Sequence, residues 1–150
     1  LVLDIKDEKE LSRVIQDLKI NFPSKKIIVQ PMEKIQMEII LGIKRDENFG
    51  PLIVFGLGGI FTEILKTVDF LVSPMNPEVI ERHIIKSKIG FLFQETRGQR
   101  PYNLKEITEI IVRLMEIASD LEKIKELDIN PLLIYNDGRP AKAIDVKIIV

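Results

Sequence analysis

The alternation of hydrophobic and polar residues along the chain predicts a mixed α/β protein of the α+β type. Short apolar or alternating runs predict strands at residues 1–5, 26–30, 37–44, 51–55, 61–66 and 68–72, and the even positions of 37–44 are the more polar. Two further strands are expected at residues 126–135 and 141–150, joined by Asn-Asp-Gly-Arg. Because such short connections form hairpins, we expect a largely antiparallel sheet.

Three segments have hydrophobic residues at helical spacing, and each begins with a capping signal. The first follows an Asp-x-x-Glu capping box that begins at Asp7, and the break at residues 22–24 ends it. The second is expected to begin at the N-cap Asn76 and to run to about Lys88. The third begins at Asn103, and its apolar stripe is wide enough to pack onto a sheet.

Composition narrows the class of protein. The 150 residues suffice for one domain with a core, and 22 lysines and arginines nearly balance 23 aspartates and glutamates. This balance argues against nucleic acid or a membrane surface as a partner. The chain has no cysteine and no apolar run long enough to span a bilayer, so we expect a cytoplasmic protein. Since the chain begins at Leu1 with no leader, we expect that upstream sequence is missing.

The final hairpin gives the sharpest inference from the residues themselves. The Asp-Gly dipeptide at residues 137–138 is one that a two-residue type I′ turn prefers. Such a turn sets the register and places Asn130 directly opposite Asp145. Pro131 and Pro140 then fall in pairs that are not hydrogen-bonded, where the missing N–H is not needed.

Opposite residues hold their Cβ atoms roughly 4.5–5.5 Å apart, so the Asn130 amide and the Asp145 carboxylate can converge on one ion. Glu126 and Asp128 share the parity of Asn130 and add oxygen donors to the same face. Such a sparse donor set suits magnesium, which fills its other positions with water and phosphate. A solvated face on which Lys147 pairs with Asp128 is the alternative, and spacing alone does not separate the two.

Two stretches of sequence resemble a known family. Glu-Leu-Asp-Ile-Asn-Pro-Leu at residues 126–132, followed by a turn and Ala-Ile-Asp at 143–145, resembles the carboxy-terminal ATP-grasp motif of ADP-forming acetyl-coenzyme A synthetases. It is more distantly similar to the nucleotide subunit of succinyl-coenzyme A synthetase. The resemblance extends to Phe-Gly-Pro at 49–51, to Phe-Gly-Leu-Gly-Gly-Ile-Phe at 55–61 and to Glu63, and so covers nearly the whole chain.

The resemblance implies an ATP-grasp fold, mainly its carboxy-terminal subdomain with a largely antiparallel sheet flanked by helices. Residues 1–25 would end the first subdomain, and residues 26–150 would form the hinge strand and the carboxy-terminal subdomain. The upstream part of the domain, with its phosphate-holding lysine, glycine segment and histidine motif, would be absent.

The resemblance also implies nucleotide-binding residues. Gln30 matches the hinge position beside the base and sugar, Glu33 lies three residues on, and Glu38 matches a glutamate that contacts the nucleotide. Pro31 departs from the family, which usually has glutamate after the hinge glutamine, so the hinge geometry is in doubt.

At the phosphate end, Asn130 and Asp145 match the magnesium ligands of the family, and Asp128 sits where a supporting acid is usual. Spacing alone favours a plain tight turn at Gly58 and Gly59, since no phosphate-binding consensus is met. The resemblance favours the other interpretation, because the family uses this glycine loop near its phosphoryl-transfer site.

Three other residues could carry charge or chemistry. His83 lies on the predicted second helix, matches no histidine motif of the family and is expected to be partly buried and structural. Arg97 and Arg100 lie in a polar loop predicted at residues 94–103, where solvated charges are expected rather than an anion site.

The activity that the resemblance implies is the interconversion of acetyl-coenzyme A, ADP and phosphate with acetate, coenzyme A and ATP. This chain would supply the nucleotide and Mg²⁺ part, and a coenzyme A-binding, phosphohistidine-bearing subunit or fused domain would be its partner. Such a protein is a hetero-oligomer or a multidomain chain. The alternatives are a succinate-coenzyme A ligase nucleotide subunit and a non-catalytic module of a fused protein acetyltransferase.

Overall fold

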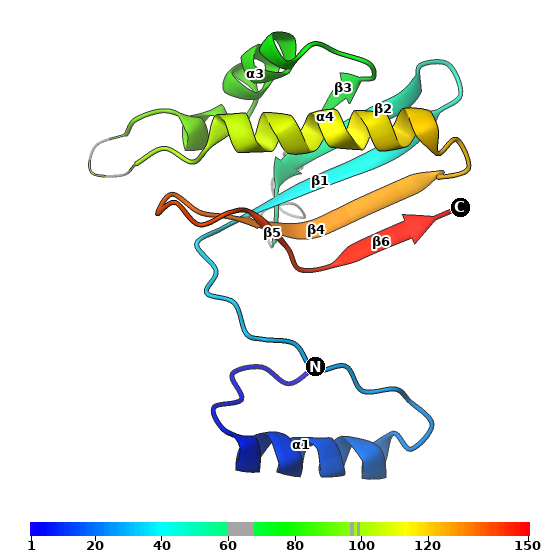
Figure 1. Ribbon diagram of the computed structural model, residues 1–150, viewed down its shortest axis with the longest axis vertical. Coiled ribbons are helices and arrows are strands. Elements are labelled where there is room, and N and C mark those ends of the chain that lie inside the picture. The colour runs from blue at the N-terminus through cyan, green and yellow to red at the C-terminus, as the bar shows by residue number, and fades with distance from the viewer. Residues whose placement is uncertain (60–67, 97, 99) are drawn as a thin grey trace. The chain divides into compact units, whose positions relative to one another are not determined.

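The computed structural model describes residues 1–59, 68–96, 98 and 100–150. The described residues form two compact units, Leu1–Lys34 and Ile35–Val150 (Figure 1). The assignment of residues 1–25 and 26–150 to two subdomains stays a prediction.

The first unit contains helix α1 (Glu8–Asn21). Its N-cap is Asp7, whose Oδ1 accepts a hydrogen bond from the Glu10 N–H at 2.8 Å. The Glu10 carboxylate accepts in turn from the Lys6 N–H at 2.9 Å, one residue before the N-cap. The predicted start of this helix is therefore confirmed, although no side chain of α1 is fully buried.

Residues 1–5 and 26–30 have no regular secondary structure, so the two strands expected there are wrong. Apolar side chains of these segments are exposed, among them Leu3, Ile28 and Val29. A strand needs a neighbour that takes up its backbone hydrogen bonds, and no strand occurs within residues 1–34, all of which are described.

The second unit is built on an antiparallel sheet with the order β3-β2-β1-β4-β5, and β6 also pairs with β4. Its described strands are β1 (Met37–Asp46), β2 (Gly50–Leu57), β3 (Val68–Val72), β4 (Glu126–Ile134), β5 (Lys142–Ala143) and β6 (Val146–Ile149). The strands predicted within residues 37–72 are confirmed, except that 61–66 lies outside the described residues. The last predicted strand, 141–150, is divided into β5 and β6. The predicted α+β class with a largely antiparallel sheet is confirmed.

Helices α3 (Pro77–Lys86) and α4 (Leu104–Asp120) lie on the same face of this sheet, and the short 3-10 helix η1 (Gly90–Phe93) lies between them in the chain (Figure 1). The Asn103 side chain caps α4 by accepting from the Glu106 N–H at 3.2 Å, as predicted. Asn76 is the N-cap of α3, but its side chain makes no capping hydrogen bond.

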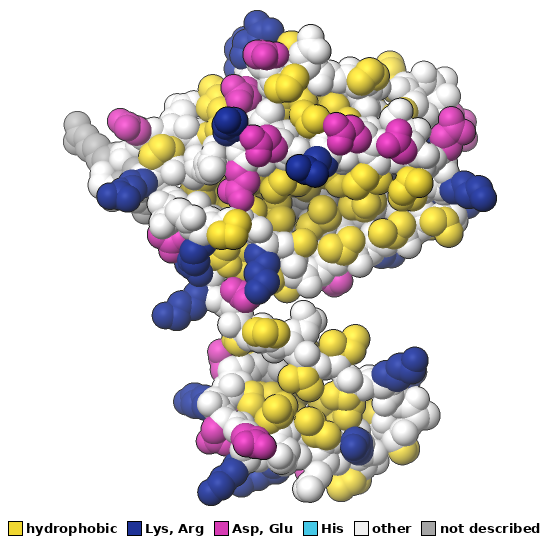
Figure 2. Space-filling view, viewed as in Figure 1, with side chains coloured by type: hydrophobic (Ala, Val, Ile, Leu, Met, Phe, Trp, Pro, Cys, Tyr) yellow, Lys and Arg dark blue, Asp and Glu magenta, His cyan; other side chains and the backbone are white. Residues whose placement is uncertain are grey.

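The core lies between the sheet and these two helices. Odd-numbered residues of β1 and β2, such as Leu41 and Phe55, pack there against α4 residues such as Ile111. Charged side chains line the outward face of α4, with hydrophobic side chains beside them (Figure 2). Successive strand residues point to opposite faces, so Glu38 and Ile40 point away from the helices. Ile40 is only 8% exposed, so the centre of β1 is buried on both faces and not half-polar as its sequence suggested.

Candidate functional site

The carboxy-terminal hairpin has the predicted register over β4 and β6. The Asn130 N–H donates to the Asp145 carbonyl at 3.1 Å, so the backbones of the predicted amide and acid lie side by side. The Ile144 N–H donates to the Pro131 carbonyl at 3.1 Å, so that pair is hydrogen-bonded, contrary to expectation. The predicted opposition of Asn130 and Asp145 is confirmed for the backbone, and their role as ligands stays a prediction.

The turn of this hairpin differs from the predicted one. Gly138 has φ 92°, but in the described part of the chain the only non-glycine residue with positive φ is Asp4. Asp137 therefore has negative φ, and the type I′ prediction is wrong, because that turn needs positive φ at both central residues. The Asp137 carboxylate instead accepts the Arg139 N–H at 3.2 Å and pairs with its guanidinium at 2.8 Å.

A β-bulge lies at the predicted amide ligand. The pairing of β1 with β4 shifts between Ile39 and Leu41, so that Asn130 and Pro131 together lie opposite the single residue Ile40. Core-facing positions of β4 are odd-numbered before the bulge and even-numbered after it. Bulges of this kind re-aim a side chain and often lie beside active sites. The β-bulge therefore determines which face of the sheet Asn130 lies on, and the alternation of hydrophobic and polar residues does not predict it.

Acidic side chains gather beside this bulge. Burial raises the pKa of the Asp128 carboxyl above its ordinary value, the neighbouring charges of Glu126 and Asp145 raise this pKa further, and Lys147 opposes them. Lys147 lies opposite Asp128 as predicted, and its ammonium is 4.0 Å from the Glu126 carboxylate. Both neighbouring carboxylates are thus close enough to Asp128 to act on its charge.

These oxygen donors suit a magnesium ion that also binds water and phosphate. Among the residues that the structure describes, no three histidine, aspartate or glutamate side chains could hold a metal ion by themselves. Magnesium usually takes one or two carboxylates and completes its shell with water and phosphate oxygens, so Asp145, the Asn130 amide and Asp128 are a suitable set. The negative charge that raises the Asp128 pKa is also what a divalent cation would neutralise. An open site completed by nucleotide phosphates fits, and a site closed by protein does not.

A second cluster lies where β2 ends. The Gly58 N–H donates to the Glu38 carbonyl at 2.9 Å. Gly59 has φ 62°, and a Cβ on this residue would collide with the Glu38 carboxylate. The carboxylate thus lies directly against the glycine backbone, in space that only glycine leaves open. The structure thus brings together Glu38, Gly58 and Gly59, three of the predicted nucleotide-binding residues. Glu38 is two positions before Ile40, the β1 residue that lies opposite the bulge.

The other two predicted nucleotide-binding residues lie in the first unit. Gln30 and Glu33 are in a segment without regular secondary structure, where Gln30 is exposed and Glu33 is partly buried. The hinge role of Gln30 stays a prediction.

The remaining candidates are His83, Arg97 and Arg100. His83 is exposed rather than partly buried as expected, and its Nδ1 is 3.1 Å from the Val79 carbonyl within the same helix. Arg97 lies outside the described residues. Arg100 is exposed, and its carbonyl accepts a hydrogen bond from the Asn136 side chain at 3.0 Å.

Gly42 has a structural role that the sequence interpretation did not include. A Cβ on this residue would lie 2.6 Å from the Leu127 carbonyl oxygen, so β1 and β4 approach each other too closely for any side chain there. Gly42 pairs with Asp128. A glycine inside an alternating strand is the signal that could have indicated this close approach.

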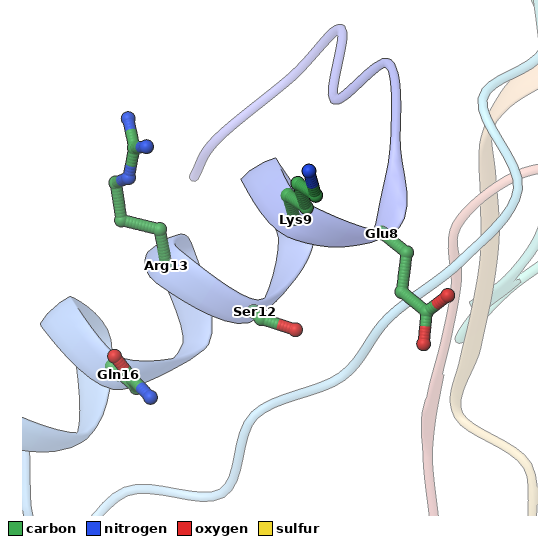
Figure 3. A pocket seen from close by; sticks show the side chains of 5 residues that line it. All are labelled: Glu8, Lys9, Ser12, Arg13 and Gln16. Atoms are coloured by element: carbon green, nitrogen blue, oxygen red, sulfur yellow. The ribbon is translucent and has the colours of Figure 1, made fainter.

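Two surface depressions are lined by residues other than those of the two clusters. One, of about 430 Å³, is lined only by α1 residues, and Figure 3 shows Glu8, Ser12 and Arg13 projecting from that single helix. The other, of about 300 Å³, is lined by residues 101–106 and 135–140. Neither contains a residue that the sequence predicts to bind nucleotide or metal.

The chain belongs to the ATP-grasp family. The family model described as "ATP-grasp domain" matches residues 1–150, the whole of the chain. In the described residues, no helix is long and apolar enough to cross a membrane.

Within that family, the chain is similar to subunits of ADP-forming ligases. It is 41% identical over 124 residues to the β subunit of Pyrococcus furiosus ADP-forming acetate–CoA ligase I. That match covers 83% of this chain and 53% of that subunit. It is 32% identical to the β subunit of ligase II of the same organism, over 100% of this chain and 67% of that subunit. The chain thus spans about half to two thirds of these relatives.

Solved structures give the same grouping. The dinucleotide-forming acetyl-coenzyme A synthetase 1 of Ca. Korarchaeum cryptofilum, in complex with coenzyme A and Mg-AMPPCP, matches with TM-score 0.86 and 31% identity. That match covers 99% of this chain and 67% of the other. PH1788 from Pyrococcus horikoshii matches with TM-score 0.81 and 34% identity over 99% of this chain and 66% of the other. The predicted family and the ATP-grasp fold are confirmed.

Proposed function

We propose that this chain is the nucleotide- and magnesium-binding part of an ADP-forming acyl-coenzyme A synthetase. The observation that carries the proposal is the adjacency of Asn130 and Asp145, whose backbones are hydrogen-bonded at 3.1 Å beside a bulge in β4. The relatives that it resembles along most of its length are ADP-forming acetate–CoA ligase subunits.

In this proposal one cluster binds the nucleotide and the other binds its metal ion. The Glu38 carboxylate contacts the nucleotide, while the backbone at Gly58 and Gly59 lies close to the phosphates without interference from a Cβ. Asn130 and Asp145 would hold Mg²⁺, with Asp128 as the supporting acid. The ion would neutralise phosphate charge during phosphoryl transfer, which depends mainly on positioning and electrostatics.

The complete protein would interconvert acetyl-coenzyme A, ADP and phosphate with acetate, coenzyme A and ATP. A phosphohistidine in a partner subunit or fused domain would donate its phosphoryl group to ADP and regenerate the free imidazole. The chain spans 53% of one of its relatives, so the coenzyme A and acid sites would lie outside it. A cytoplasmic location stays a prediction from composition.

The test is calorimetric titration of Mg-ADP into the natural full-length protein and its Asn130→Ala and Asp145→Ala variants. Both substitutions remove a ligand, so each should weaken Mg-ADP binding by about tenfold or more, and the difference should vanish when EDTA removes the metal. Asp120→Ala is the matched control, because Asp120 is an exposed acid at the end of α4, on the helix-covered side of the sheet. Tight metal-dependent binding that ignores both substitutions would refute the metal assignment.

A further inference from the structure

A reciprocal amide pair closes one end of the ladder between β1 and β4. The last paired residues there are Met37 and Ile134. Just beyond them, the Asn136 N–H donates to Gln36 Oε1 at 2.9 Å, and Gln36 Nε2 donates to Asn136 Oδ1. The Gln36 side chain thus bonds both the backbone and the side chain of Asn136, and it continues the hydrogen bonding of the strands beyond their last paired residues.

Asn136 also holds a third segment. Its Nδ2 donates to the Arg100 carbonyl at 3.0 Å, in the loop that precedes α4. Every polar atom of this carboxamide therefore has a partner, which fixes its orientation. The start of β1, the loop before α4 and the final hairpin meet at this one residue.

The place of Gln36 in the chain gives this contact its importance. Gln36 is the second residue of the second unit, and residues 26–35 before it have no regular secondary structure. Glu38 follows two positions later, with its carboxylate against Gly59. Strand ends fray where nothing holds them, and fraying at Gln36 would move Glu38 away from the glycine loop.

We propose that Gln36 and Asn136 are positioning residues for the nucleotide site, since their amide pair fixes the start of β1 and with it the Glu38 carboxylate. This inference rests on the proposed function, in which Glu38 contacts the nucleotide. Neither residue touches the nucleotide in this proposal. Their effect on affinity passes through the backbone of residues 36–38.

The experiment is a double-mutant cycle on the natural full-length protein. Gln36→Ala, Asn136→Ala and the double variant are compared by the calorimetric dissociation constant for Mg-ADP and by thermal unfolding. Each single variant should bind Mg-ADP about tenfold more weakly, as expected for the loss of two hydrogen bonds. The double variant should lose less affinity than the sum of the two single losses, because both substitutions remove the hydrogen bond from Gln36 Nε2 to Asn136 Oδ1.

Asn136→Asp is the matched control. Its carboxylate still accepts from Gln36 Nε2, and its backbone N–H still donates to Gln36 Oε1, but it cannot donate to the Arg100 carbonyl. This variant should bind Mg-ADP nearly as well as the parent. Because Gln36 is exposed, its substitution should leave the fold intact and would carry the test even if Asn136→Ala does not fold.

Three results would overturn the inference: unchanged Mg-ADP affinity in Gln36→Ala, additive losses in the double variant, or a loss in Asn136→Asp as large as in Asn136→Ala. A lowered unfolding temperature without a change in affinity would assign the pair a structural role alone. If the parent protein and the variants bind Mg-ADP with the same affinity, only this inference fails. If the parent itself does not bind, the proposed function fails with it.

Discussion

The carboxylate of Glu38 lies against Gly59, which has φ 62° and leaves no room for a Cβ. Gly59→Ala should therefore displace the carboxylate from the place where we propose that it meets the nucleotide. We expect Mg-ADP binding to weaken by about tenfold, measured by calorimetry on the natural full-length protein.

Gly50→Ala separates this displacement from backbone strain. Gly50 has φ 71°, close to that of Gly59, but a Cβ there would have no atom within 4 Å. Both variants should lose about 1–2 kcal/mol of unfolding free energy, because positive φ is unfavourable for alanine. Only Gly59→Ala should lose nucleotide affinity, and equal affinity losses in the two would argue against a role for Glu38.

Gly42→Ala tests the close approach of β1 and β4. The new Cβ would lie 2.6 Å from the Leu127 carbonyl oxygen, and backbone on both sides would have to shift. We expect a loss of about 1–3 kcal/mol in unfolding free energy, as for other overpacked sites, measured by urea denaturation. A variant within about 0.5 kcal/mol of the parent would show that the strands can separate at this point without penalty.

The register of the final hairpin could be predicted, although its turn could not. The type I′ turn is wrong, yet Asp128 lies opposite Lys147 as predicted. A one-residue slip would turn the apolar face of β4, which includes Leu127, away from the core, so the hydrophobic pattern specifies the register independently of the turn. The turn depends on the local Asp137–Arg139 contact, which alternation does not encode.

Other features depend on contacts that a linear pattern does not contain. The contact of Glu38 with Gly59 joins a residue of β1 to the turn that follows β2. The bulge at Asn130 changes which residues of β4 face the core. Residues 26–30 have the composition of a strand, but a strand forms only where another one can pair with it. The candidate site residues came largely from the family resemblance, which carries such tertiary information, and their roles stay predictions.

Arg45 is predicted to stabilise the end of α4. Its guanidinium donates to the carbonyls of Ala118 at 2.6 Å and Leu121 at 3.1 Å, and its Nε donates to that of Ile124 at 2.7 Å. Carbonyls at a helix carboxy-terminus lack intrahelical partners and carry partial negative charge, so a cation is favourable there. Arg45→Met should lower the unfolding free energy by about 2 kcal/mol in urea denaturation.

Arg113→Met is the control for that measurement, because Arg113 is exposed in the middle of α4. It should change the unfolding free energy by less than about 0.5 kcal/mol. Equal losses in the two variants would mean that general charge, and not the helix end, accounts for the effect of Arg45.

Asp128 should make the stability of the metal-free protein fall as pH rises. Burial and the neighbouring acids raise the pKa of its carboxyl in the folded state above the ordinary value of 3.8. Between the unfolded and folded pKa values the folded state binds more protons than the unfolded state, so the unfolding free energy decreases with increasing pH. At neutral pH the ionised carboxylate is therefore unfavourable to folding without a cation.

Asp128→Asn removes this titration and should raise the stability of the metal-free protein at neutral pH, with a flatter dependence on pH just above 3.8. Thermal unfolding in EDTA across that range measures the effect as the difference between variant and parent. Saturating Mg²⁺ with ADP should stabilise the parent more than the variant, because the bound cation neutralises the charge that the variant lacks. A variant less stable than the parent throughout the range in EDTA would contradict the electrostatic account, since it would mean that the Asp128 carboxylate helps folding before any metal binds.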